Sequence, residues 1–110
     1  MNLLPCDIEA GRAVFAGNPV RVANASLETN GRGSVELGIR PEFVRFDPEG
    51  IEVSITRHDD LGRYQLVETE HHGHIIKMIL AEGAAVPATN PRIAFDPDYA
   101  WVYADGWVIN

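Results

Sequence analysis

The segment from residue 68 to residue 74 carries the densest group of side chains that could bind a metal, two glutamates followed by His71, His72 and His74. Neutral imidazoles bind zinc and nickel well, so this composition suggests a metal site. Adjacent residues on a strand point to opposite faces, however, and metal-binding histidines need partners that hold their rings in one orientation. A turn centred on Gly73 would leave all three imidazoles in solvent. We therefore predict a polar hairpin tip here, with no metal and no cofactor.

Three other short motifs could take part in catalysis or ion binding, and each has a simpler structural interpretation. His58-Asp59-Asp60 resembles part of an acid-base triad, but no Gly-x-Ser-x-Gly nucleophile motif accompanies it, and the Leu-Gly that follows favours a loop or turn. Cys6 has apolar neighbours and no nearby basic group, which predicts an inert core thiol. Asp96-Pro97-Asp98 lacks the other oxygen ligands of a calcium loop and predicts a turn. We predict no catalytic residue in this chain.

Aromatic residues gather near the C-terminal end. Tyr99, Trp101 and Tyr103 are spaced two residues apart and would share one face of a strand, and Trp107 follows them. Such a face could pack in the core or cover the end of a barrel. It could also form a protein interface, where Trp and Tyr are enriched, or a platform on which bases or sugars stack.

The overall counts exclude several classes of protein. The chain has 110 residues, with 9 Lys and Arg against 16 Asp and Glu, a formal net charge of −7 and 45% hydrophobic residues, which predicts one folded domain. Its single lysine, Lys77, follows no glycine-rich loop, so the sequence lacks the phosphate-binding loop of ATPases. The excess of negative charge disfavours nucleic acid as a partner.

Cysteine usage and hydropathy indicate the compartment. Cys6 is the only cysteine and cannot form an internal disulfide. No apolar run in the sequence approaches the roughly 20 residues that span a bilayer, and residues 1–5 lack the features of a signal peptide. We therefore predict a cytoplasmic protein without direct membrane insertion.

Proline and glycine divide the sequence into short pieces, which predicts an all-β fold. About ten short strands in one small domain should close or stack, because open sheet edges invite aggregation, so we expect a small barrel of antiparallel strands. The expected strands span residues 3–8, 13–16, 19–23, 34–39, 51–56, 63–69, 73–80, 92–95, 100–103 and 107–109.

Several local signals predict the connections between these strands. Residues 24–34 are polar and contain Asn-Gly, which predicts a loop. Pro41 should end the strand before it, and residues 41–44 could form one helical turn. Residues 51–56 alternate between apolar and polar, which predicts one half-buried strand. Asp105-Gly106 lies between apolar runs and predicts the turn of a hairpin.

Four segments resemble, in the same order, the C-terminal regulatory domain of ATP-binding subunits of ABC importers of the maltose and glycerol-phosphate type. Residues 34–44, Ser-Val-Glu-Leu-Gly-Ile-Arg-Pro-Glu-Phe-Val, are similar to the family's Leu-Gly-Ile-Arg-Pro-Glu-His segment, with Phe43 in place of the histidine. Residues 1–5 resemble the exit from the nucleotide-binding domain, and residues 61–67 resemble an internal Leu-Gly strand. Residues 100–109 resemble the closing His-Leu-Phe-x-x-Asp-Gly-x-x-Ile hairpin.

The resemblance covers residues 1–110 and implies a TOBE-type, OB-like β-barrel whose upstream nucleotide-binding domain is absent. In this family the domain performs no chemistry. It packs against the nucleotide-binding domain of its own subunit, pairs with the twin ATPase subunit, and in some members receives a regulatory protein or a small ligand. The parent subunit energises import of sugars, polyols, glycerol or glycerol phosphate, which implies a position at the inner face of the cell membrane within a transporter complex.

Four residues are candidates for the interdomain or dimer contact. Arg40 and Glu42 bracket a proline, so their opposite charges would lie on a stiff turn suited to such a contact, although they could equally be the solvated ends of a strand turn. Trp101 and Tyr103 belong to the aromatic face described above.

Two other functions fit the same fold class. Related TOBE domains bind molybdate or similar ions, so the chain could be an oxyanion- or small-ligand-binding module, for which backbone amides and cationic or hydroxyl side chains would have to line a pocket. It could also be a free-standing OB domain for nucleic acids or oligosaccharides, which the charge balance disfavours.

Overall fold

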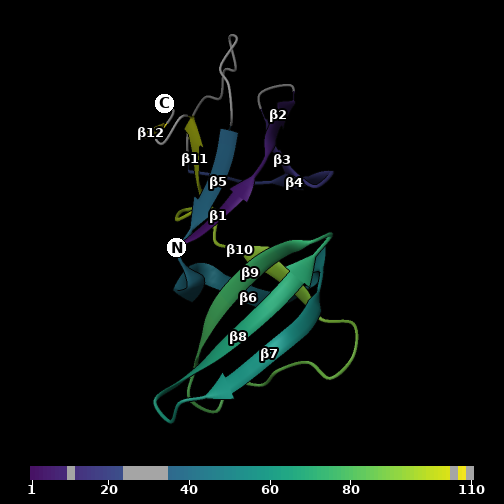
Figure 1. The fold of residues 1–110 in the computed structure, drawn as a ribbon, viewed down its shortest axis with the longest axis vertical. Helices are drawn as coiled ribbons and strands as arrows, with labels where there is room; N and C mark the ends of the chain where they lie inside the picture. Colours follow the sequence, from purple (N-terminus) through teal and green to yellow (C-terminus); the bar gives the residue numbers. More distant parts are fainter. Residues whose placement is uncertain (10–11, 24–34, 105–106, 109–110) are drawn as a thin grey trace. The chain divides into compact units, whose positions relative to one another are not determined.

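The computed structural model describes residues 1–9, 12–23, 35–104 and 107–108, and their regular secondary structure consists almost entirely of β-strands (Figure 1). The predicted all-β class is confirmed. The described part of the chain contains one helical element, the 3-10 turn η1 (Pro41–Phe43), at the place where Pro41 predicts it. The predicted loop over residues 24–34 and the Asp105-Gly106 turn lie outside the described residues.

The chain divides into two compact units. The first unit contains residues 1–39 and 95–110, and the second contains residues 40–94. The prediction of a single accessory domain over residues 1–110 stays a prediction.

The first unit contains two sheets. One has the strand order β1-β5-β11-β12 and the other has the order β2-β3-β4. The strands are β1 (Asn2–Pro5), β2 (Asp7–Glu9), β3 (Arg12–Phe15), β4 (Asn18–Val20), β5 (Val35–Ile39), β11 (Trp101–Ala104) and β12 (Trp107–Val108).

The second unit contains a long three-stranded sheet with the order β7-β8-β9, and most of the pair β6-β10. Its strands are β6 (Val44–Glu52), β7 (Ser54–Asp60), β8 (Tyr64–His71), β9 (His74–Ala81) and β10 (Arg92–Phe95). In Figure 1, β7, β8 and β9 lie side by side as a twisted ribbon. β6 passes very close to β10 at Gly50. A Cβ atom at this position would overlap the backbone carbonyl group of Ile93, so only glycine fits there.

Two expected strands are each broken at one residue where the chain changes sheets. Residues 3–8 divide at Cys6 into β1, which pairs with β5, and β2, which pairs with β3. Residues 51–56 divide at Val53 into the end of β6 and the start of β7. Each junction residue donates its backbone amide to another segment, Cys6 to the Val35 carbonyl and Val53 to the Pro91 carbonyl, both at 3.0 Å.

Two further differences between the expected and the observed strands concern where β6 begins and where β7 ends. Residues 44–50, which were expected to lie outside strands, belong to β6 and continue directly from η1. His58-Asp59-Asp60 was expected in a loop or turn, but it lies on β7 because its backbone pairs with β8, and the turn begins only at Leu61. The pairings among the described strands form four sheets, and no closed barrel is detected among them.

Alternating burial defines the core of each unit. In the first unit Leu4, Phe15, Leu37 and Val102 are almost fully buried on the inner faces of their strands. In the second unit the inner face of β7-β8-β9 is built from residues such as those at 67, 76 and 78, each at most 1% exposed. The period of two in the sequence therefore identifies the buried faces correctly even where the strand boundaries differ.

Candidate functional site

β11 carries the aromatic side chains that the sequence singles out. Trp101 and Tyr103 are half-buried, whereas Val102 between them is fully buried, so the two aromatic rings lie on the outer face of the sheet. Tyr99 was expected to share this face, but it lies before β11 in the turn over residues 96–99 and is 48% exposed. The predicted turn at Asp96 is confirmed, with the amide of Asp98 donating to the Asp96 carboxylate at 3.0 Å.

Two neighbouring strands complete this outer face. Gly38 of β5 pairs with Trp101 on one side and with Leu3 of β1 on the other. A Cβ atom on Gly38 would lie 2.6 Å from Cε1 of Tyr103 and 3.4 Å from Cδ2 of Leu3, so both side chains cover the glycine. Glu36 lies on the same face of β5, in register with Tyr103. We call Leu3, Glu36, Gly38, Trp101 and Tyr103 the acidic-aromatic face.

The turn after β5 carries the other two candidate contact residues. Arg40 has an extended backbone (φ −74°, ψ 146°), and its carbonyl oxygen accepts a hydrogen bond from the amide of Phe43 at 3.0 Å. Arg40 and Glu42 are both exposed. Because Pro41 fixes the backbone between them, the two charges are held on a short, stiff turn.

The four candidate residues form two pairs in different units. Trp101 and Tyr103 lie together on the acidic-aromatic face of the first unit. At the start of the second unit, Arg40 directly precedes η1 and Glu42 lies within it. Their role in an interdomain or dimer contact stays a prediction.

The histidine segment forms the expected hairpin but departs from the expected exposure. His71 and His74 end β8 and begin β9, and His72 (φ 48°) and Gly73 (φ 83°) make the two-residue turn. His71 is only 8% exposed, so the expectation that all three imidazoles are solvated is wrong for this residue. The reason is the alternation of β8, which directs His71 to the same inner face as its buried neighbours at 67 and 69.

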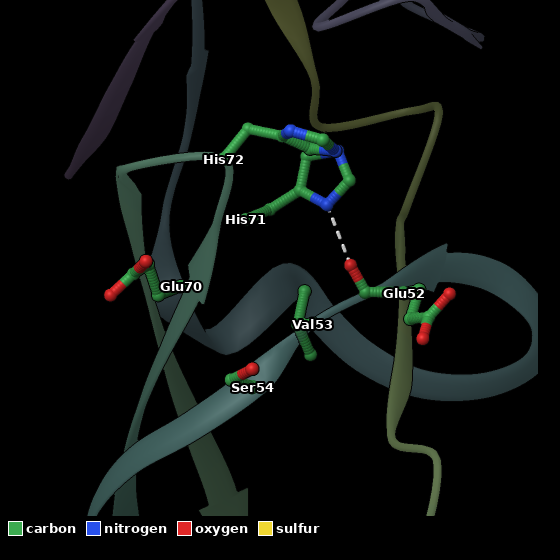
Figure 2. A pocket seen from close by; sticks show the side chains of 6 residues that line it. All are labelled: Glu52, Val53, Ser54, Glu70, His71 and His72. Carbon is green, nitrogen blue, oxygen red and sulfur yellow. Dashed lines mark hydrogen bonds between the residues drawn. The ribbon is translucent and has the colours of Figure 1, made fainter.

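A hydrogen bond fixes the His71 ring. Its Nδ1 lies 2.6 Å from the backbone oxygen of Glu52 (Figure 2). A carbonyl oxygen can only accept, so Nδ1 carries the proton and donates. The His72 ring contacts the His71 ring edge to face, with centroids 4.3 Å apart. The hydrogen bond from His71 to Glu52 therefore connects the hairpin tip to the end of β6.

A small polar pocket of about 220 Å³ lies beside this hairpin, lined by Glu52, Val53, Ser54, Glu70, His71 and His72. Figure 2 shows the carboxylates of Glu52 and Glu70 pointing away from the two imidazole rings. Across the described residues, no group of three or more His, Cys, Asp or Glu side chains is arranged to hold a metal ion.

A second groove, of about 240 Å³, lies on the outer face of the β7-β8-β9 sheet. It contains the cations Arg57 and Lys77, but also the carboxylates of Asp59 and Glu68. Nε of Arg57 lies 2.8 Å from Oδ2 of Asp59, and Glu68 stands in register between Arg57 and Lys77. Opposite charges alternate here, which is not the electropositive lining that an oxyanion site requires.

His58 takes part in a structural network rather than in an acid-base pair. Its Nε2 lies 2.6 Å from Oε1 of Gln65, which is only 5% exposed. The side-chain amide nitrogen of Gln65, Nε2, donates to the backbone oxygens of Ala81 and Ala84, at 3.1 and 2.9 Å. Because both oxygens are acceptors, Oε1 of Gln65 must accept, and Nε2 of His58 donates.

Cys6 packs with Ile8 and Val35 against the buried pair Ala13 and Val102. Burial raises the pKa of its thiol to about 11, and the carboxylates of Asp7 and Glu36 add to the rise. The thiol therefore stays protonated at neutral pH, as predicted for an inert core cysteine.

Alkylation of Cys6 by iodoacetamide is expected to be slow at pH 8, because the thiolate is the reactive species. The rate should rise with pH and show a midpoint near the pKa of about 11. Mass spectrometry of the intact chain between pH 7 and 11.5 measures this, with glutathione as the reference thiol and circular dichroism to confirm folding at each pH. A midpoint at or below that of glutathione would show that burial does not raise the pKa of the Cys6 thiol.

Sequence reasoning missed Leu3, Glu36 and Gly38 as neighbours of the aromatic pair. Glu36 and Gly38 are two residues apart on a predicted strand, so the period of two places them on one face. No local signal indicates that this strand lies between β1 and β11, because its partners are distant in sequence. The pairing with β1 joins residues 31 to 37 positions apart, and the pairing with β11 joins residues 63 to 69 positions apart.

Comparisons of the whole sequence with protein-family models and with curated proteins give no match. Among the residues that the structure describes, no helix is long and apolar enough to cross a membrane.

Proposed function

We propose that this chain is an accessory regulatory domain of the ATP-binding subunit of an ABC importer for sugars, polyols, glycerol or glycerol phosphate. In this role it binds the nucleotide-binding domain and the twin subunit on the cytoplasmic side of the membrane, and it hydrolyses no ATP itself. A domain of this kind acts by making different contacts in the open and closed states of the ATPase, which needs stable surfaces and no nucleophile.

One observation supports the proposal most strongly. The segment that resembles the family motif forms the strand β5 and then η1. Its Leu-Gly-Ile part is buried, whereas Arg40 and Glu42, on either side of the half-buried Pro41, are exposed. This arrangement explains why the two parts of the motif occur together. The buried strand fixes the position of the turn, and Pro41 restricts the backbone between Arg40 and Glu42, so both charges are available to a partner in fixed positions. The acidic-aromatic face offers a second surface with the aromatic composition of interfaces.

The test begins with the gene. We expect an ATP-binding subunit with Walker motifs to be encoded either in the same reading frame upstream of Met1 or beside it, together with permease genes. Absence of both would contradict the proposal.

A binding experiment follows from the same expectation. Tagged chain and the neighbouring nucleotide-binding domain, expressed together, should co-purify, and the double charge reversal Arg40→Glu with Glu42→Arg should reduce recovery. The matched control is Arg63→Glu with Glu82→Arg, which makes the same pair of changes at two exposed positions elsewhere in the second unit. If both double substitutions reduce the recovery of the nucleotide-binding domain equally, the result would argue against a contact at η1.

A further inference from the structure

We propose that the acidic-aromatic face binds a cationic segment of a partner protein, in which arginine or lysine side chains alternate with apolar ones. The partner does not have to be a transporter subunit, so this binding and the transporter role can fail independently.

The geometry of the face suits a flat, extended ligand. Tyr103 and Leu3 both lie over Gly38, which has no side chain to separate them, and Trp101 stands opposite the same glycine. Leu3 is 53% exposed, and Trp101 and Tyr103 are half-buried, so the apolar surface is accessible but held in place by the sheet. Trp and Tyr are the residues that most often dominate binding energy when a partner covers them.

The negative charge of Glu36 beside the aromatic rings favours a cationic ligand. Glu36 is in register with Tyr103, so a guanidinium or ammonium group placed over the Tyr103 ring would also be within reach of a carboxylate. Burial is the main cause of the raised pKa of Cys6, and the nearby carboxylates of Asp7 and Glu36 add to it. The described part of the first unit carries the carboxylates of Asp7, Glu9, Glu36, Asp96 and Asp98 against the guanidinium groups of Arg12 and Arg21.

The same charges disfavour other occupants. A second copy of this chain brings another formal charge of −7 to the contact, and a nucleic acid brings phosphates. A cationic protein segment is the occupant for which the rings and the carboxylate act together, since aromatic faces and carboxylates both attract cations.

The test uses the full chain and a fluorescein-labelled hexapeptide of alternating leucine and arginine, with leucine-glutamine and leucine-glutamate hexapeptides as matched probes. Fluorescence anisotropy at 50 mM salt should show the arginine peptide binding at least about tenfold more tightly than the other two. In two-dimensional NMR spectra, the shifted signals should include the Trp101 indole N–H and the amides of β5 and β1.

Two substitutions separate this face from general attraction to an acidic protein. Glu36→Gln should weaken arginine-peptide binding about fivefold, whereas Glu82→Gln, which removes the same charge in an exposed turn of the second unit, should change it less than about twofold. Trp101→Ala should weaken it about tenfold or more, and Trp101→Phe should weaken it less, since Phe keeps an aromatic face. If Trp101→Ala does not fold, Glu36→Gln and Trp101→Phe still test the site.

Three results would overturn the proposal. These are equal affinity for the arginine and glutamine peptides, equal effects of Glu36→Gln and Glu82→Gln, or NMR shifts confined to other sheets. Shifts of β1, β5 and β11 that depend on protein concentration, without peptide, would assign the face to a second copy instead.

Discussion

Gly50→Ala is expected to lower the free energy of unfolding by about 3 kcal/mol. The added Cβ would overlap the backbone carbonyl group of Ile93, and a backbone group cannot rotate away as a flexible side chain can. β6 and β10 would therefore have to separate, which also weakens the hydrogen bond from Nη1 of Arg92 to the Gly50 oxygen, 3.1 Å long. Urea denaturation followed by circular dichroism measures the change.

The matched control for this substitution is Gly62→Ala in the same unit. Gly62 has φ of +89°, so alanine is strained there, but its Cβ would meet no atom within 4 Å. Its cost should be about 1 kcal/mol, that of the unfavourable backbone conformation alone. If Gly50→Ala costs no more than Gly62→Ala, β6 and β10 do not approach as closely as described.

Gln65→Leu is expected to cost about 2 kcal/mol of unfolding free energy, the second largest effect. Leucine has a similar size, so little packing is lost, but the part-buried backbone oxygen of Ala84 loses the donor from Gln65 and Nε2 of His58 loses its acceptor. The Ala81 oxygen loses one of two donors, because it still accepts from the Ala84 amide at 3.1 Å. Leaving buried polar groups without partners costs more than a hydrogen bond contributes when it is formed. Thermal and urea unfolding, compared with the wild type, measure the effect.

His58→Ala is the control for Gln65→Leu. It removes one hydrogen bond at an exposed residue and leaves both contacts between Gln65 and the backbone in place, so it should cost about 1 kcal/mol. Gln65→Leu and His58→Ala should also be non-additive when combined, because they remove the same bond. Equal costs for the two single substitutions would mean that the backbone contacts of Gln65 contribute little.

The sequence predicts the class of the fold and most of its strands, because both follow from local patterns. Gly and Pro mark the breaks, and the period of two identifies buried faces such as that of Val67 and Thr69. The two junctions at Cys6 and Val53 could not be predicted in this way. The apolar-polar alternation continues through Val53, and only the choice of a different partner strand, made by distant residues, divides the segment.

The candidate surfaces were predicted only in part for the same reason. The spacing of Trp101 and Tyr103 places them on one face, and the local effect of Pro41 predicts the turn beside Arg40. The neighbours of the aromatic pair come from strand order, which joins Leu3 to residues near position 100 through β5. The burial of His71 depends similarly on the end of β6 lying against the hairpin.

We expect the junction residues to influence how each unit opens. Within each unit, the amide at the point of transfer between sheets is itself hydrogen-bonded, from Cys6 to Val35 in the first unit and from Val53 to Pro91 in the second. A sheet cannot release its strand at a junction without breaking this bond and disturbing the next sheet along the chain. In hydrogen exchange, the Cys6 and Val53 amides should therefore be protected like those of the adjoining strands, with the two sheets of each unit opening as one cooperative block.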